Sequence, residues 1–421
     1  MKAIHVLYIS YDGMTDPLGQ SQVIPYLRGL CSHGFVFHLI SFEKPDRLKA
    51  GRNKIKNLLD SSGIHWYPCL YTKNPPVLST IIDLRMMIKK TRSIIAANDI
   101  KILHCRSYIS ALCGEKMSKR FNIPFLFDMR GFWADERVDG KIWNLSNPVF
   151  NLIYRFFKKK EKDFLHHAHH IVSLTHAAKR EILNQYLSSA DENKITVIPC
   201  CADLSHFNPS SLKNTDIENK RIQLNLNSNS EVLIYLGSLG TWYMGEEMIR
   251  LYSNLLKIKP EMIFLIVTKD DTSQISDYCK KHHVPIQNIR FVQAEREEVP
   301  TLIALSKISV FFILPSYSKK ASSPTKLAEL MSMGIPVLCN SGVGDVADIV
   351  NEYEAGWVLD DFSEESMQKI SKLITQSPEA NKTRLREAAS EYGSLETGVK
   401  RYQQIYGSLL EFRHDDNCHR A

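Results

Sequence analysis

The chain has 421 residues, of which 44% are hydrophobic and 24% are charged, the composition of a globular protein large enough for two domains. No stretch approaches the roughly 18 apolar residues of a membrane-spanning helix, and the first residues resemble a strand rather than a secretion signal. Nine cysteines without any Cys-x-x-Cys spacing favour reduced cytosolic thiols and argue against a zinc site. The first 200 residues contain 29 Lys and Arg against 17 Asp and Glu, a net charge of +12, so we expect this half to attract something anionic.

Short aliphatic runs alternate with amphipathic stretches, which is the pattern of βα units around parallel sheets. The strands predicted for the front half are residues 3–9, 35–41, 101–105, 123–128, 170–174 and 194–199. Those predicted for the back half are residues 231–237, 262–267, 289–293, 308–314, 336–340 and 356–360. We therefore predict an α/β protein with two Rossmann-like, doubly wound parallel-sheet domains, facing each other across a cleft at the carboxyl ends of both sheets.

A stretch rich in Pro, Ser and Asn near residues 198–225 marks the boundary between the two halves. The chain ends in a helical pattern that follows a break at Gly393 and gives way to a polar tail. The predicted divisions are an N-terminal domain, a linker, a C-terminal domain, a last helix and a disordered tail, at residues 1–199, 200–225, 226–392, 393–413 and 414–421.

The loop after the first strand carries Gly13 and Gly19 before a helix that we predict to begin near Gln20. A glycine turn at a helix start lets backbone N–H groups approach an anion, so Asp16, Gly19 and Gln20 are candidates for contacts with phosphate or substrate hydroxyls. The spacing is not G-x-G-x-x-G, so a dinucleotide fingerprint is absent. A plain turn is the alternative.

The segment FLFDMRGFWADE, residues 125–136, concentrates charged and aromatic residues at the end of a predicted strand. Such residues are costly to pack at the mouth of a parallel sheet and are typical of a site. We take Asp128 and Arg130 as candidate catalytic residues. The alternative is a structural Asp–Arg pair that organises the loop.

A basic segment with interleaved aromatic residues follows, and its cations are Arg155, Lys158, Lys159, Lys160 and Lys162. A basic amphipathic helix of this kind can rest on an anionic membrane surface. The alternative is a solvated helix whose aromatic residues face the core. The histidines that follow, 166, 167, 169 and 170, cross from a helix end into a strand, so their rings should diverge, and we predict no metal site.

The stretch SKKASSPTKLAELMSMGIP, residues 318–336, places Lys319, Lys320 and Lys326 around the start of a helix. Ser323 is the predicted N-cap. The N-terminus of a helix is partly positive, so the lysines should repel it unless an anion binds there. Lys326 and Glu329 share one helix edge, which offers a cation for phosphate and a carboxylate for vicinal hydroxyls. A surface Lys–Glu pair is the alternative.

A second glycine loop, LGSLGTWYMGEE, follows the first strand of the back half. Its Gly237, Ser238 and Gly240 are predicted to form the wall opposite the lysine-bearing helix. Both segments follow strands of the same predicted sheet, so their positions agree with their chemistry.

These motifs resemble the GT-B glycosyltransferases, and most closely the retaining enzymes of glycosyltransferase family 4. VIPCCADLSHFNP, from Val197, is similar to the interdomain segment of that family, PTKLAELMSMGIPVL, from Pro324, to its donor-site helix, and SGVGDVADIV, from Ser341, to the glycine turn that follows. The resemblance covers nearly the whole chain.

The resemblance implies an N-terminal acceptor-binding domain, a C-terminal domain that binds a nucleotide sugar, and a last helix that packs back on the first domain. The implied reaction is retaining, metal-independent transfer of a hexose-like sugar from a nucleotide diphosphate sugar to a glycan or lipid-linked glycan, as in cell-surface polysaccharide biosynthesis, with no further cofactor and no nucleic acid partner. Lys326 would also serve catalysis by stabilising the leaving diphosphate. The implied donor-binding residues are Gly237, Ser238, Ser322, Ser323, Thr325, Lys326 and Glu329.

The sequence also departs from the family pattern. Glu329 matches the second acid of the Glu-(seven residues)-Glu motif, but Ala321 stands where the first acid belongs, so Ser322 or Ser323 would have to replace its contact with the sugar. A non-catalytic GT-B subunit and a GT-B nucleotide-sugar epimerase are therefore alternative interpretations. We expect a cytoplasmic protein, with peripheral contact to the inner face of the cytoplasmic membrane as a hypothesis from charge.

Overall fold

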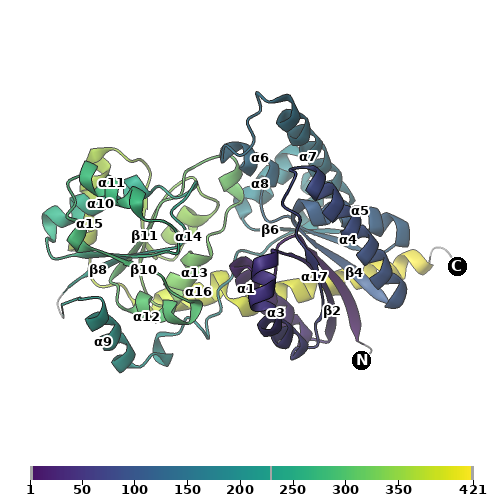
Figure 1. The fold of residues 1–421 in the computed structure, drawn as a ribbon, viewed down its shortest axis with the longest axis horizontal. Coiled ribbons are helices and arrows are strands. Elements are labelled where there is room, and N and C mark those ends of the chain that lie inside the picture. Colours follow the sequence, from purple (N-terminus) through teal and green to yellow (C-terminus); the bar gives the residue numbers. More distant parts are fainter. Residues whose placement is uncertain (1–2, 228–229, 419–421) are drawn as a thin grey trace. The chain divides into compact units, whose positions relative to one another are not determined.

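The computed structural model describes residues 3–227 and 230–418. The chain divides into two compact units, Met1–Cys201 with Leu395–Ala421 and Ala202–Ser394 (Figure 1). Each unit is built on one entirely parallel sheet with helices packed against it. The predicted α/β class with two doubly wound parallel sheets is confirmed.

The first unit contains a seven-stranded sheet in the order β3-β2-β1-β4-β5-β6-β7. Its strands are β1 (Ile4–Ser10), β2 (Phe35–Glu43), β3 (His65–Leu70), β4 (Ile100–Arg106), β5 (Phe125–Asp128), β6 (His170–Ser173) and β7 (Ile195–Val197). Its helices are α1 (Pro17–Gln22), α2 (Ile24–Cys31), α3 (Pro45–Asp60), α4 (Leu78–Ala97), α5 (Ser107–Phe121), α6 (Trp133–Asp139), α7 (Pro148–His167), α8 (His176–Gln185) and α17 (Leu395–Cys418).

The second unit contains a six-stranded sheet in the order β10-β9-β8-β11-β12-β13. Its strands are β8 (Val232–Leu236), β9 (Ile263–Val267), β10 (Ile289–Val292), β11 (Ile308–Phe311), β12 (Val337–Asn340) and β13 (Gly356–Leu359). Its helices are α9 (Asn214–Gln223), α10 (Gly245–Ile258), α11 (Ser273–Lys281), α12 (Val299–Ala304), α13 (Thr325–Ser332), α14 (Val346–Glu352), α15 (Glu364–Gln376) and α16 (Lys382–Gly393).

In both sheets the first strand lies in the middle, and the direction in which successive strands are added reverses once. The reversal falls between β1 and β4 in the first unit and between β8 and β11 in the second. Ligands of open α/β sheets bind at the carboxyl ends of the strands beside such a reversal. The loops after β1, β4, β8 and β11 are therefore the places to look for a site.

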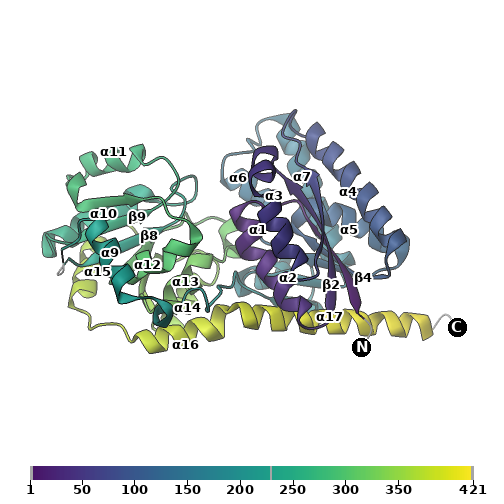
Figure 2. The same ribbon diagram turned by 60° about the horizontal axis from the view of Figure 1, so that its bottom comes forward.

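The strands form because their sequences are continuous runs of aliphatic and aromatic residues, which suit burial on both faces of a parallel sheet. All five residues of β8 are buried, as are all four of β11. Helix α17 runs along the first unit (Figure 2). Its Tyr402 and Tyr406 pack on His104 of β4, and Tyr406 also packs on Phe37 of β2.

Three elements differ from the sequence predictions. Strand β3 escaped prediction because Pro68 interrupts it, and the structure places it at the sheet edge, where a missing N–H group is tolerated. Helix α9 lies inside the stretch that was predicted as linker. The last helix runs to Cys418 instead of ending before a disordered tail, since no glycine or proline interrupts residues 408–418; residues 419–421 lie outside the described part.

Candidate functional site

Helix α13 begins at Thr325, and Pro324 occupies its N-cap position. The predicted cap, Ser323, is wrong because it lies one residue before the N-cap position, and its hydroxyl lies 3.3 Å from the Tyr392 hydroxyl. Gly334, at φ +74°, follows the helix end, as glycine commonly does. The helix presents Lys326 in its first turn and Glu329 one turn later.

The Lys326 ammonium is buried in the second unit, with the residue 8% exposed. Its Nζ atom lies 4.0 Å from the centre of the Tyr243 ring and 4.6 Å from that of Tyr235. Among the residues that the structure describes, none accepts a hydrogen bond from this ammonium group. The ring faces supply some cation–π attraction, but a buried cation without an acceptor is costly.

The surroundings of Lys326 change its titration. Burial lowers the pKa of its ammonium group to about 7, and the nearby Glu329 carboxylate only partly opposes this shift. Burial also raises the pKa of Glu329, although the charges of Arg296 and Lys326 act in the other direction. The site is therefore short of negative charge around the lysine, and an anion there would restore its protonated form.

The loop after β8 lies against the Lys326 ammonium. Gly237 has φ +124°, and a Cβ atom added to it would stand 2.9 Å from Nζ. The Ser238 carbonyl accepts a hydrogen bond from the Tyr235 hydroxyl, and both Gly237 and Ser238 are exposed. Of the predicted wall, Gly237 therefore lies beside Lys326, and the roles of Ser238 and Gly240 stay predictions.

Glu329 is mostly buried, and its carboxylate lies 3.5 Å from the guanidinium of Arg296. Arg296 precedes α12 and also stacks over the Phe207 ring. No local pattern in the sequence pointed to Arg296, Tyr235 or Tyr243, because they come from three separate loops and strands. Only the adjacency of β8 and β11 brings the tyrosines to Lys326.

The segment before α13 forms a short 3₁₀ turn, Ser318–Ala321. Lys319 is buried with Nζ 3.7 Å from the centre of the Trp242 ring, whereas Lys320 is exposed. Ala321 is buried, so this position offers no side-chain oxygen, and Ser322 beside it is half-buried. The three lysines therefore do not act as one group, because Lys319 lies over Trp242, Lys326 lies beside Gly237, and Lys320 is exposed.

In the first unit, Glu43 holds the loop after β1 in place. Its buried carboxylate accepts hydrogen bonds from the backbone N–H groups of Met14 and Thr15, at 2.7 and 3.0 Å. Gly19 lies inside α1, which starts at Pro17 and not near Gln20 as predicted, and a Cβ atom there would clash with the Gly13 carbonyl oxygen.

Two of the loop's candidate residues have partners inside the first unit. Asp16 forms ion pairs with Lys44 and Arg47. The Gln20 side chain donates a hydrogen bond to the Thr15 carbonyl oxygen at 3.2 Å. Their contacts with a substrate stay a prediction.

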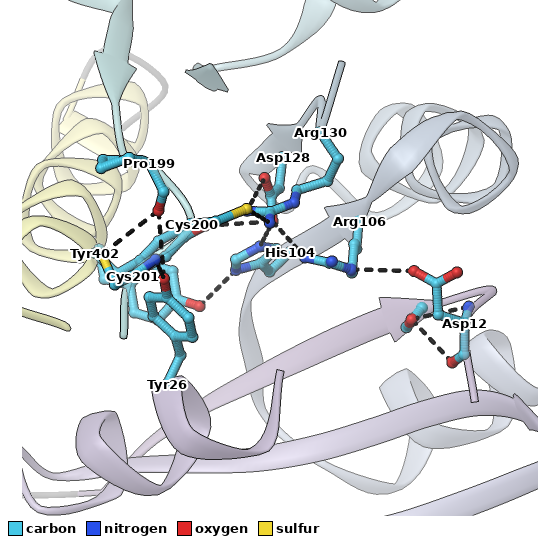
Figure 3. A network of polar contacts seen from close by, with 12 residues as sticks. Asp12, Tyr26, His104, Arg106, Asp128, Arg130, Pro199, Cys200, Cys201 and Tyr402 are labelled. Atoms are coloured by element: carbon cyan, nitrogen blue, oxygen red, sulfur yellow. Dashed lines mark hydrogen bonds and ion pairs between the residues drawn. The ribbon is translucent and has the colours of Figure 1, made fainter. Parts of the chain in front are cut away.

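Figure 3 shows a buried polar network at the carboxyl ends of β4 and β5. One carboxylate oxygen of Asp128 lies 3.8 Å from the Arg130 guanidinium. The other oxygen lies 3.6 Å from the Arg106 guanidinium and accepts a hydrogen bond from the Tyr402 hydroxyl at 3.3 Å. Burial would raise the pKa of Asp128, but Arg130, the hydrogen bond from His104 and Arg106 hold it below its usual value.

Two further contacts extend this network toward the surface and toward residue 200. Arg106 reaches the half-exposed Asp12 at 3.1 Å, and Arg130 donates to the Cys200 sulfur at 3.2 Å (Figure 3). Arg130 adopts φ +59°, a strained conformation for a non-glycine residue. Arg106 and Tyr402 were missed from the sequence because they lie far from Asp128 along the chain.

The basic segment of α7 uses two of its lysines inside the first unit. Lys158 lies 2.7 Å from Asp135 and 2.5 Å from Glu161, and Lys160 lies 2.9 Å from Asp163. These two cations are therefore poor candidates for membrane contact. In the part of the chain that the structure describes, no three His, Cys, Asp or Glu residues are grouped as metal ligands.

A cavity of about 530 Å³ lies elsewhere in the second unit, beside α10 and α11. Its lining includes Arg250, Lys281 and His282, whose charged partners are Glu364 and Glu246. None of the predicted site residues lines it, so we do not assign the site there.

Two family models match the chain and together span most of it. The model described as "Glycosyltransferase Family 4" matches residues 21–206, and the one described as "Glycosyl transferases group 1" matches residues 216–393. The chain belongs to the GT-B glycosyltransferases of the family 4 type. In this glycosyltransferase, α13 and the β8 loop fall in the second matched region, and Asp128 and Arg130 fall in the first.

Solved structures share the fold of this glycosyltransferase at low sequence identity. Sucrose-phosphate synthase from Thermosynechococcus elongatus is 16% identical with a TM-score of 0.73, covering 97% of this chain and 99% of its own. HepE from Anabaena, in complex with UDP and glucose, is 12% identical with a TM-score of 0.68, covering 96% and 100%. WaaG, a glycosyltransferase involved in lipopolysaccharide biosynthesis, is 15% identical with a TM-score of 0.59, covering 95% and 99%.

No curated protein matches the sequence of this glycosyltransferase. Across residues 3–227 and 230–418, no helix has both the length and the apolar character that a membrane span requires.

Proposed function

We propose that this glycosyltransferase moves a hexosyl group from a nucleotide diphosphate sugar to a hydroxyl of a glycan or lipid-linked glycan, with retention of anomeric configuration. One observation carries the proposal: the buried Lys326 ammonium has no hydrogen-bond acceptor among the described residues and faces the Gly237 loop. This pair sits where the strand order of the second unit reverses.

A diphosphate fits this place better than a carboxylate or a neutral sugar. The start of α13 and the Lys326 ammonium both favour negative charge, and Gly237 lets an anion approach the backbone closely. Glu329, one helical turn away, would accept hydrogen bonds from the two ribose hydroxyls. Ser322, Ser323, Thr325 and Ser238 would complete the donor contacts.

In the proposed reaction, the bond between the anomeric carbon and the diphosphate oxygen breaks while a bond to the acceptor oxygen forms on the same face. The leaving diphosphate gains charge, which Lys326 and the N–H groups of α13 would stabilise. The proton of the acceptor hydroxyl passes to an oxygen of the leaving phosphate. Since these groups supply the positive charge, the proposal includes no metal and no other cofactor.

We assign acceptor binding to the first unit. Both Asp128 oxygens face buried cations or hydroxyl donors, so its carboxylate suits positioning of Arg130 and Arg106 better than proton transfer. Arg130 would then lie nearest the reacting groups, and Asp16, Gly19 and Gln20 would border the acceptor. Two structurally similar proteins support the wider assignment, because HepE forms a complex with UDP and WaaG is a glycosyltransferase involved in lipopolysaccharide biosynthesis. The proposed setting is cell-surface polysaccharide assembly by a cytoplasmic protein with peripheral membrane contact.

Thermal unfolding with UDP tests the donor assignment. At about one hundred times its Kd, UDP should raise the free energy of unfolding by about 2.7 kcal/mol. Glu329→Ala should weaken UDP binding about tenfold, because two hydrogen bonds to the ribose are lost. The same variant should bind 2′,3′-dideoxy-UDP as well as the natural protein does. If Glu329→Ala weakened the binding of both nucleotides equally, Glu329 would not bind the ribose hydroxyls. If no nucleoside diphosphate stabilised the protein, the donor site itself would be refuted.

A further inference from the structure

Helix α4 buries several polar residues against its own unit and exposes several aliphatic residues to solvent. Its inward stripe packs on α5 and β2 and contains three polar residues, Ser79, Asp83 and Thr91. Its outward side carries aliphatic residues in the first two turns, where Leu78 is 58% and Ile82 is 48% exposed. A surface helix of a soluble domain normally has the opposite arrangement.

Two of the inward polar residues, Asp83 and Thr91, have hydrogen-bond partners within the first unit. The Asp83 carboxylate accepts hydrogen bonds from the Tyr11 hydroxyl at 2.8 Å and from the Thr72 backbone N–H at 3.1 Å. The Thr91 hydroxyl accepts from the Cys113 thiol at 3.5 Å. These contacts tie α4 to the loops after β1 and β3 and leave its aliphatic side outward.

The cations on the same side of α4 continue the aliphatic line. Leu78, Ile82, Arg85, Lys89 and Arg92 recur every three or four residues, so they fall along one edge of the helix. The two aliphatic residues occupy the start of this edge, and three exposed cations occupy the rest. Within residues 71–98 the only carboxylate is that of Asp83, which is buried.

We define the α4 face as a set of exposed residues on one side of α4 and in the loop before it, which are Lys73, Val77, Leu78, Ile81, Ile82, Arg85, Met86, Lys89 and Arg92. We propose that the α4 face lies on an anionic lipid bilayer, with the aliphatic start of the helix among the acyl chains and the cations at the level of the headgroups. Interfacial helices bind in this way, through apolar area together with attraction to acidic lipids.

The composition of the α4 face favours a bilayer over a macromolecular partner. Protein interfaces are enriched in aromatic side chains, and this face has none, while nucleic acid would not select for aliphatic residues. Each of its cations would strengthen binding to an acidic surface about fivefold.

Other segments at the carboxyl edge of the same sheet add exposed aliphatic residues. Leu70 ends β3 and is 54% exposed, and Leu18 lies in α1, directly after the β1 loop. On α7, the aliphatic Leu152 is exposed near the helix start. Because the carboxyl ends of parallel strands share one edge, the bilayer would lie at the edge that also carries the Asp128 network.

Vesicle co-sedimentation of the full-length protein tests the α4 face, with vesicles of phosphatidylcholine alone and of phosphatidylcholine with phosphatidylglycerol in equal parts. The natural protein should co-sediment with the acidic vesicles and stay in the supernatant with the neutral ones. Leu78→Ser with Ile82→Ser should lower binding to acidic vesicles more than tenfold. Arg85→Glu with Lys89→Glu should lower it by at least twentyfold, through the loss and reversal of two charges.

The matched control is Ile222→Ser with Leu373→Ser, which removes two exposed aliphatic residues from the second unit and should leave binding unchanged. Circular dichroism should show natural helix content for every variant, since all substituted residues are exposed. Equal binding by the α4 variants and the natural protein would overturn the proposal. So would a dimer in solution that Leu78→Ser with Ile82→Ser dissociates, because the face would then cover a second copy.

The inference deepens the membrane contact in the proposed function, but vesicle binding is measured without substrate, so its failure would leave the transferase proposal standing.

Discussion

Lys326→Met is expected to abolish sugar transfer while making the free protein more stable. The methionine side chain has nearly the same length, but it removes a buried ammonium that has no acceptor among the described residues. Loss of a charged contact to the diphosphate should weaken UDP binding about 100-fold and slow donor turnover by a further 10²–10³-fold if the contact strengthens as the bond breaks. Calorimetric binding and donor hydrolysis measure the two effects separately.

The gain in stability has a pH dependence of known sign. Burial lowers the pKa of Lys326 to about 7, whereas an unfolded lysine titrates near about 10.4. Between these values the unfolded chain binds more protons than the folded one, so the stability of the natural protein rises with pH. Lys326→Met should therefore be more stable by about 2–4 kcal/mol at pH 7, and this difference should shrink toward pH 10.

Lys372→Met, an exposed lysine on α15, is the matched control and should change neither stability nor UDP binding. Denaturant unfolding at pH 7 and pH 9 gives the stability comparison. If Lys326→Met kept natural turnover of the donor, the ammonium would not be the anchor of the diphosphate. The interpretation as a non-catalytic subunit would instead be supported by UDP binding without turnover in the natural protein.

Asp128→Asn is expected to destabilise the first unit by about 3–5 kcal/mol. The substitution keeps the shape of the side chain but leaves the buried guanidinium groups of Arg106 and Arg130 without their common counter-ion. Because the pKa of Asp128 is lowered in the folded state, its stabilising contribution is complete above a pH of about 4 and is lost as the pH falls below that value. Urea unfolding between pH 7 and pH 3 measures both effects.

Two variants make the Asp128 prediction specific. Asp60→Asn removes an exposed carboxylate that pairs with Lys56 on α3, and it should cost no more than about 0.5 kcal/mol. Asp128→Asn with Arg130→Met also removes one of the two cations that lose their counter-ion and should recover part of the lost stability. An Asp128→Asn protein as stable as the natural one would show that the network carries no net charge interaction.

The sequence predicted the two sheets well because continuous apolar strands and their spacing are local properties. It also identified the lysine-bearing helix, since cations at a helix start conflict with the helix dipole wherever the helix lies. It could not separate Lys326 from Lys319, because that depends on which aromatic ring each lysine meets. Lys319 lies over Trp242, while Lys326 lies between Tyr235 and Tyr243.

The network around Asp128 shows the other limit of sequence reasoning. The Asp–Arg pair was visible because both residues belong to one short segment. Arg106 and Tyr402 were not, since their contacts to Asp128 depend on the pairing of β4 with β5 and on the path of α17. The outward aliphatic side of α4 was missed for a similar reason. The sequence does not say which side of this helix packs against the sheet and which side meets solvent.

Proton uptake on UDP binding tests the role of Lys326 most directly. At pH 8 the free Lys326 amine should be mostly neutral, while the UDP phosphates are ionised, so binding should take up about 0.9 proton. Titration calorimetry in HEPES and in Tris, which differ in ionisation enthalpy and place no phosphate in the site, measures this number. We predict uptake of nearly one proton by the natural protein and none by Lys326→Met. UDP binding with no proton uptake, or with natural affinity in Lys326→Met, would contradict the account.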